Sequence, residues 1–263
     1  MNPEISYASQ SENIGPEPTP QSFFNRLIGV YFSPGETFQE IGRAPRVLLP
    51  IIVFAALAMI TSFIVIKRVP LEVSMKQVDE QLQRQVESGR ITQEQAEQRR
   101  EASKPIVNFF RMAIPVIAPV GVIVIALIIT GVAKLVSLLI GVENSFKPLF
   151  SVALYATLAI SIISSILSVI LIFIKPAEDI DLENPLPSNV AGLLSALGMA
   201  MQSRFLKIFL GYLDVFFIWK LALLAIGFAA VSKKLKNSTA LTWVVIIALL
   251  IMLIHSSYSA VFG

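Results

Sequence analysis

Long apolar stretches, separated by short polar connections, dominate the chain. Crossing the hydrocarbon core of a bilayer takes roughly 20 mostly apolar residues. Five stretches reach this length, and they predict transmembrane helices at about 47–66, 112–133, 149–174, 208–231 and 240–261. Because the number of crossings is odd, we expect the two ends of the chain on opposite sides of the membrane. The pattern predicts an all-α, polytopic membrane helix bundle.

The second stretch contains three residues that disturb a helix. Pro115, Pro119 and Gly121 lie within it, and they free backbone groups that a neighbouring helix must satisfy inside a membrane. We expect a kinked helix that packs inside the bundle.

A polar tail and two short helices precede the first span. Residues 1–21 are rich in Pro, Ser and Glu, which is typical of a disordered tail and not of an export signal. Ser33, Pro34 and Glu36 match the capping-box pattern at a helix start, so a helix should run from there to about Gly42. Before it, an apolar face at helical spacing predicts a short helix in the membrane interface; its residues are Phe23, Phe24, Leu27, Ile28, Tyr31 and Phe32.

The polar segment 71–104, between the first two spans, predicts a soluble helical hairpin. Gly89 stops its first helix, and Thr92 with Gln95 caps a second one at 92–104. The hairpin is either a solvated spacer that packs on itself or a docking surface for protein partners. Apolar residues recur at helical spacing along the first helix, and these are Met75, Val78, Leu82 and Val86.

The connection after the third span combines an acidic, proline-broken stretch with a short apolar segment at 188–203. This segment is short for a span, so it fits a re-entrant or interfacial helix, or a sixth span if it crosses. Asp179, Asp181 and Glu183 alternate like the start of a calcium loop, but Val190 stands where the twelfth residue should be Glu. We reject a calcium site there.

Composition identifies lipid as the solvent for most of the chain. The 263 residues are 55% hydrophobic and 15% charged, whereas soluble domains carry about 25% charged residues. The net charge of +3 is scattered, which argues against nucleic acid as a partner. Without cysteine, the chain has no thiolate nucleophile, disulfide or thiol-linked lipid.

The chain lacks the common motifs of enzymes. No GxxxxGK[ST], HExxH or GxSxG pattern and no Cys/His cluster is present, so we expect no catalytic residues, cofactor or metal. The one histidine, His255, lies in the last third of the fifth span, in a polar run suited to the headgroup level. Proton handling or ligand contact is the alternative role for this histidine.

Two charged residues, Asp214 and Lys220, fall within the fourth predicted span, where ionised groups are costly. In one continuous helix they would lie about 120° apart and roughly 9 Å along the axis, which makes them poor partners for each other. We therefore expect partners on other helices, with Lys134 a candidate for Asp214 and Glu143 for Lys220. Alternatively, Asp214 lies near an interface and Lys220 snorkels, with no functional polar centre.

Basic residues in short loops set the orientation of membrane proteins. Lys233, Lys234 and Lys236 in the tight turn after the fourth span place that turn, and with it the N-terminus, in the cytoplasm. The basic residues of the hairpin segment argue the other way, although acidic residues dilute them and the segment is long enough to weaken the rule.

Three segments resemble the Yip1 domain family, in its compact prokaryotic form. They are FFNRLIGVYFSPGETFQEIGRAPRVLLP, FKPLFSVALYATLAI and LDVFFIWKLALLAIGFAAVSKK. The resemblance covers about residues 22–261, and it implies a five-helix bundle with a cytoplasmic N-terminus, here in the inner membrane of a prokaryote. It transfers no catalytic residues. Eukaryotic relatives are associated with Rab-type GTPases and vesicle traffic; the hairpin at 71–104 and the short tail depart from the family, so GTPase-linked partners are not expected.

Two functions from different classes remain open. The chain is a non-enzymatic protein that organises or adapts other membrane components, or it is a transporter or lipid-translocating bundle with a polar path at Asp214 and Lys220. Membrane lipids are partners in either case. Faces of small residues permit close helix approach or self-association; they are Ser161, Ser165, Ser168, Ala225 and Ala229.

Overall fold

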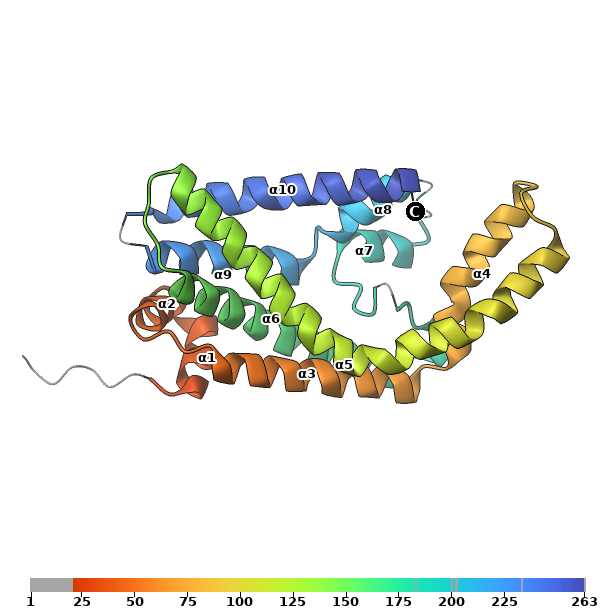
Figure 1. Cartoon of the computed structure of the whole chain (residues 1–263), viewed down its shortest axis with the longest axis horizontal. Coiled ribbons are helices and arrows are strands. Elements are labelled where there is room, and N and C mark those ends of the chain that lie inside the picture. Colours follow the sequence, from red (N-terminus) through yellow and green to blue (C-terminus); the bar gives the residue numbers. More distant parts are fainter. Residues whose placement is uncertain (1–20, 183, 200, 202, 233, 263) are drawn as a thin grey trace, which may run out of the picture.

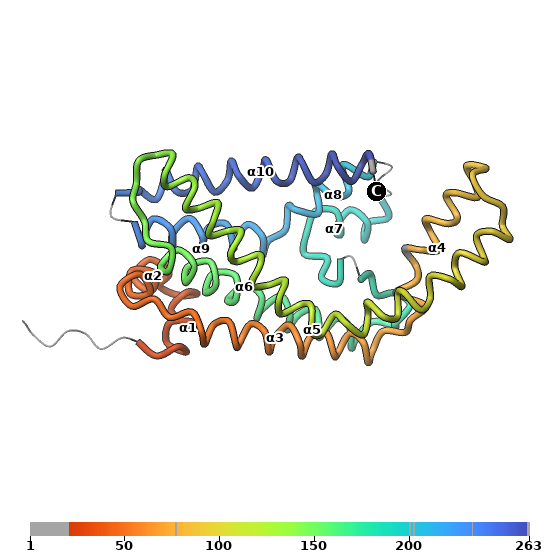
Figure 2. Tube along the Cα trace, in the orientation of Figure 1, coloured from red at the N-terminus to blue at the C-terminus, as the bar shows by residue number. Residues whose placement is uncertain are grey.

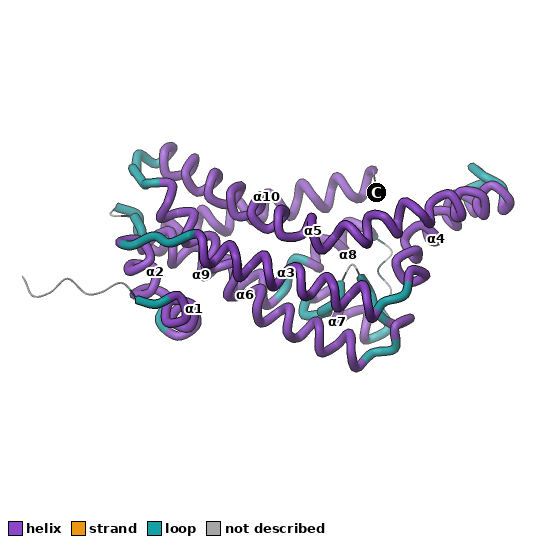
Figure 3. The backbone as a smooth tube through the Cα atoms, turned by 60° about the horizontal axis from the view of Figure 1, so that its bottom comes forward, coloured by secondary structure: helices purple, strands orange, loops and turns teal. Residues whose placement is uncertain are grey.

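The structure, a computed structural model, describes residues 21–182, 184–199, 201, 203–232 and 234–262. Of the predicted tail, only Gln21 is among the described residues. Glu183 and Lys233 also lie outside them. The described part is helical with no named strand (Figure 3). Its helices are α1 (Phe23–Phe32), α2 (Pro34–Arg43), α3 (Leu48–Arg68), α4 (Leu71–Glu87), α5 (Gln93–Leu139), α6 (Phe146–Ile174), the 3-10 turn η1 (Ala177–Asp179), α7 (Val190–Ala196), α8 (Arg204–Gly211), α9 (Val215–Ala230) and α10 (Asn237–Phe262).

The predicted all-α membrane bundle is confirmed, with one span altered. Helices α3, α5, α6 and α10 are long and apolar enough to cross a membrane, whereas α9 is a shorter apolar helix. Helices α3, α6, α9 and α10 run roughly along the long axis of the molecule, and α5 crosses them obliquely (Figure 1). The α4 hairpin projects at one end, called the hairpin end, and α1 and α2 lie at the other, called the α2 end. The chain finishes toward the hairpin end, opposite α1 and α2 (Figure 2).

The predicted continuous span at 208–231 is wrong. Two helices, α8 and α9, replace it, and residues 212–214 interrupt them. A sixth span at 188–203 is also wrong for the described residues, because α7 covers only Val190–Ala196 and a turn at Gly198, with φ of 76°, follows it.

The hairpin and the second span share one helix. The second hairpin helix and the span were predicted separately, but α5 runs unbroken through 47 residues, about 70 Å. Pro105, Pro115 and Pro119 lie inside it, and Figure 1 shows α5 changing direction where it enters the bundle. Arg111 donates to the carbonyls of Ile66 and Val69, which fixes this bend against the end of α3.

The hairpin itself agrees with its prediction. Gly89, with φ of 69°, follows the end of α4, and Thr92 and Gln95 form both bonds of a capping box. Arg100 Nε lies 2.7 Å from Asp79 Oδ1, and this hydrogen bond raises the pKa of Arg100. The apolar side chains that join the two arms are Leu82, Ile91 and Ala96, with Val78 and Val86 beside them.

Both predicted short N-terminal helices are present, and they pack on the end of the bundle in different ways. Helix α2 packs into the end of the bundle against α6 and α9, and its Phe38 and Ile41 are fully buried. Helix α1 buries Phe23 and Val30 on one face and exposes an outer apolar face of Phe24, Ile28 and Phe32. Helix α2 starts at Pro34 as predicted, but Ser33 makes no side-chain cap, so the capping box there is wrong.

Candidate functional site

A polar site lies at the break between α8 and α9. Asp214 is the N-cap of α9, and its Oδ1 accepts hydrogen bonds from the backbone N–H groups of Phe216, at 2.8 Å, and Phe217, at 2.9 Å. A carboxylate at this position satisfies free donors and meets the positive end of the helix dipole. Asp214 is therefore a cap at a helix start, and not a charge in the middle of a span.

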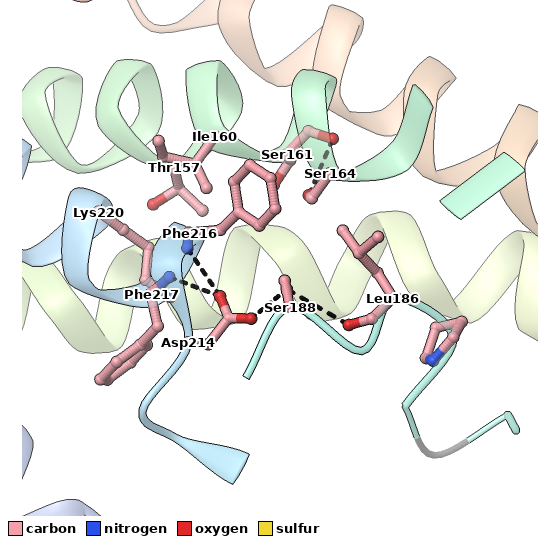
Figure 4. Close-up of a pocket in the computed structure, with 11 residues that line it drawn as sticks. Thr157, Ile160, Ser161, Ser164, Leu186, Ser188, Asp214, Phe216, Phe217 and Lys220 are labelled. Atoms are coloured by element: carbon pink, nitrogen blue, oxygen red, sulfur yellow. Dashed lines mark hydrogen bonds between the residues drawn. The ribbon is translucent and has the colours of Figure 1, made fainter. Parts of the chain in front are cut away.

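A short extended segment covers the break from the other side. The backbone N–H of Val190 donates to the carbonyl of Leu213, at 3.2 Å, and that of Val215 donates to the carbonyl of Ser188, at 3.4 Å. The Ser188 hydroxyl also donates to Asp214 Oδ2 (Figure 4). Inside a membrane, a broken helix is tolerated only where such partners satisfy its backbone.

The break opens onto a polar cavity of about 290 Å³. Ser161, which lines it, is the sixteenth of the 29 residues of α6, so the cavity lies near the middle of a helix about 43 Å long. Helix α9 has 16 residues, about 24 Å, and cannot cross a hydrocarbon core of about 30 Å. The cavity lining includes Thr157, Ser161, Ser164, Leu186, Ser188, Asp214, Phe216, Phe217 and Lys220 (Figure 4).

Lys220 lines the same cavity from the second turn of α9. Its Nζ lies 5.0 Å from the ring centroid of Phe217, which is cation–π distance. It also interacts electrostatically with Asp214, although no ion pair joins the two in the described part of the chain. The structure thus places Asp214 and Lys220 at one cavity. The Asp214 carboxylate accepts three hydrogen bonds, and the Lys220 ammonium makes a cation–π contact with a ring.

The other two predicted members of the centre lie elsewhere. Lys134 donates to the carbonyl of Asn144, at the α2 end of α5. Glu143 is exposed in the loop after α5. The suggested pairs Lys134–Asp214 and Glu143–Lys220 are not formed, because this loop closes the end of the bundle while the cavity lies near its middle.

A second buried charge site was not predicted. Arg26 of α1 is fully buried, and its Nη2 and Nε each lie 2.7 Å from a carboxylate oxygen of Glu40 in α2. Its Nη1 has no hydrogen-bond partner among the described residues, although the guanidinium interacts electrostatically with Tyr155. An arginine within the apolar sequence FFNRLIGV was the available signal; its partner, 14 residues later, was not evident.

The polar run of the last span that contains His255 lies toward the hairpin end (Figure 1). His255 is exposed, and its Nδ1 lies 3.0 Å from the Tyr212 hydroxyl. This contact connects α10 to the break before α9.

The small residues Ala225 and Ala229 pack on Ala240 of α10, so they make a helix contact within the chain.

These features define a polytopic helical membrane protein with a polar cavity at an interrupted helix. A model of the Yip1 domain matches residues 28–258, which is most of the chain. The chain therefore belongs to the Yip1 domain family, as the three segments suggested. No curated protein and no solved structure matched it.

Proposed function

We propose that this Yip1-domain protein is a non-enzymatic component that organises or adapts other membrane proteins, with the hairpin as its docking arm. The observation that supports this is the unbroken α5, which joins the arm to the bundle as one helix. A partner bound at the hairpin would thereby be positioned relative to the membrane.

The proposed orientation places the N-terminus in the cytoplasm of a prokaryote and the hairpin beyond the inner membrane. Basic residues gather in the connections at the α2 end, which supports this by the positive-inside rule; they include Arg43, Arg46, Lys147, Lys234 and Lys236. Cysteines introduced at exposed Arg90 and at Lys234, tested with a membrane-impermeant thiol reagent in intact cells, should react only at residue 90.

Affinity purification in mild detergent with quantitative mass spectrometry tests the docking arm. We would compare the intact protein with a variant lacking residues 71–104 and with charge reversals at the exposed tip, Arg90→Glu and Glu94→Lys. Charge reversal at Lys234 is the matched control. Partners that disappear with the deletion and with the tip variants, but remain with the Lys234 control, support the proposal. Partners that remain with the deletion and with both tip variants refute it.

A second function is favoured by the interrupted helix and its cavity. Transporters often place substrate near the membrane midplane at discontinuous helices. Here Asp214 and Lys220 line a cavity at an interrupted helix, near the middle of α6, which supports this function. In reconstituted vesicles, Asp214→Asn and Lys220→Met should stay folded and lose movement of lipid or solute. Full movement in both variants would exclude this function.

A further inference from the structure

An apolar cleft lies beside the polar cavity, between α5, α9 and α10. It has a volume of about 450 Å³, within the range of ligand pockets. Helix α5 packs on α3 and α6, whereas α10 packs on α8 and α9. The cleft is the space left between these two sets of helices. Its lining runs from Phe217 to Phe228 on α9 and from Ala240 to Ile251 on α10. Each stretch is about 17 Å long, about the depth of one leaflet of a hydrocarbon core of about 30 Å.

Two residues border both the cleft and the cavity. Phe217 and Lys220 line each of them. The Lys220 ammonium lies over the Phe217 ring and interacts electrostatically with Asp214, but it forms no ion pair or hydrogen bond in the described part of the chain. The apolar cleft therefore adjoins, at Phe217 and Lys220, a cavity that contains hydroxyl groups, one ammonium and one carboxylate. This arrangement is complementary to an amphiphile that has a charged head and places one apolar chain in the cleft.

We infer that the cleft and the cavity together bind a zwitterionic phospholipid that carries a primary ammonium. One acyl chain lies in the cleft, the phosphate lies at Lys220, and the lipid ammonium lies at Asp214. The hydroxyls of Ser161 and Ser164 supply further polar contacts around the head.

Charge balance selects this head over an anionic one. The cavity holds one carboxylate and one ammonium, so a zwitterion pairs with both and leaves no net charge. A purely anionic head would bring its phosphate close to Asp214 and leave one negative charge in excess beside the apolar cleft, where an unpaired charge is costly. This inference deepens the second proposed function by naming the substrate class, but a protein can hold a lipid without moving it.

Native mass spectrometry of the full-length protein tests the site. The protein is exchanged into micelles that contain equal amounts of phosphatidylethanolamine and phosphatidylglycerol with matched chains. The wild type should retain phosphatidylethanolamine at least several-fold over phosphatidylglycerol. Equal retention, or more phosphatidylglycerol, would overturn the assignment without the use of any variant.

Three variants then locate the groups. Asp214→Asn keeps an N-cap side chain but loses the charge, so the preference should shift toward phosphatidylglycerol. Lys220→Met should lower retention of both lipids about tenfold, as expected for loss of a charged hydrogen bond. The matched control Lys134→Met should behave as the wild type, and an unchanged Lys220→Met would refute the placement of the phosphate.

The chain position has its own pair of variants on α5. Val132 lines the cleft, whereas exposed Leu135 does not. Val132→Phe should lower retention of both lipids, and Leu135→Phe should not; equal retention by the two would refute a chain in the cleft. If lipid retention follows these expectations but reconstituted vesicles show no lipid movement, the protein binds the lipid at this site and does not translocate it.

Discussion

We predict that breaking the buried Arg26–Glu40 pair destabilises the protein, by an amount that can be estimated from the burial of the two side chains. The Arg26 side chain is 0% exposed and that of Glu40 is 20% exposed. Glu40→Ala leaves the guanidinium buried without a counter-ion, and its Nη1 already lacks a hydrogen-bond partner among the described residues. Removing one partner of a buried pair costs about 3–5 kcal/mol; because Glu40 is partly exposed, we expect about 3 kcal/mol of unfolding free energy.

The assay is reversible unfolding in mixed micelles with increasing SDS, followed by tryptophan fluorescence. Trp219 reports on this region, since its ring lies 5.9 Å from that of Tyr31 in α1. The double variant Arg26→Met with Glu40→Gln removes both charges and should recover most of the lost stability. Glu80→Ala, which removes an exposed pair with Arg84, is the control and should change little. A double variant as unstable as Glu40→Ala would refute an unpaired charge as the cause.

Three further changes test the local geometry. Gly227→Ala would place a Cβ 2.4 Å from Val152 Cγ1 and should cost about 1–3 kcal/mol by the same unfolding assay, whereas Gly121→Ala meets nothing within 4 Å and should be tolerated. Thr92→Ala removes the capping box and should cost about 1 kcal/mol, seen as faster hydrogen exchange at the hairpin tip and not in the bundle. Asp214→Ala should cost about 0.5–2 kcal/mol and Asp214→Asn much less; equal losses would contradict the role of this side chain as a cap.

Features that depend on neighbours in sequence could be predicted. The apolar lengths locate four spans, and the spacing of apolar residues with Gly89 and Thr92 predicts the hairpin. These signals are local: a period of 3.6 residues, a glycine at a helix end, a hydroxyl before a helix start. The resemblance carried by three segments also identified the family.

Features that depend on distant pairs could not be predicted. Average hydropathy over 208–231 hides the break at residues 212–214, because apolar residues flank it on both sides. From the sequence alone, Asp214 is a costly charge within a span. Its hydrogen bond from Ser188 depends on the segment 188–190 lying beside the break, and no local sequence signal indicates that pairing. The Arg26–Glu40 pair was missed for the same reason, since the two residues lie on different helices.

The two charged sites, buried Arg26 with Glu40 and half-buried Asp214 with Lys220, differ in how completely the protein pairs their charges. This difference suggests a structural role for the first and a binding role for the second. Arg26 faces a carboxylate at 2.7 Å, so its charge is balanced within the fold and locks α1 to α2. Asp214 has three donors and Lys220 has a ring within cation–π distance. The two interact electrostatically, but neither forms an ion pair among the described residues. An ammonium that has no close ion pair in an apolar helix bundle bears a cost that packing alone does not explain. A ligand that supplies both missing charges removes that cost, which is why we assign the binding site to this cavity and not to the better-paired arginine.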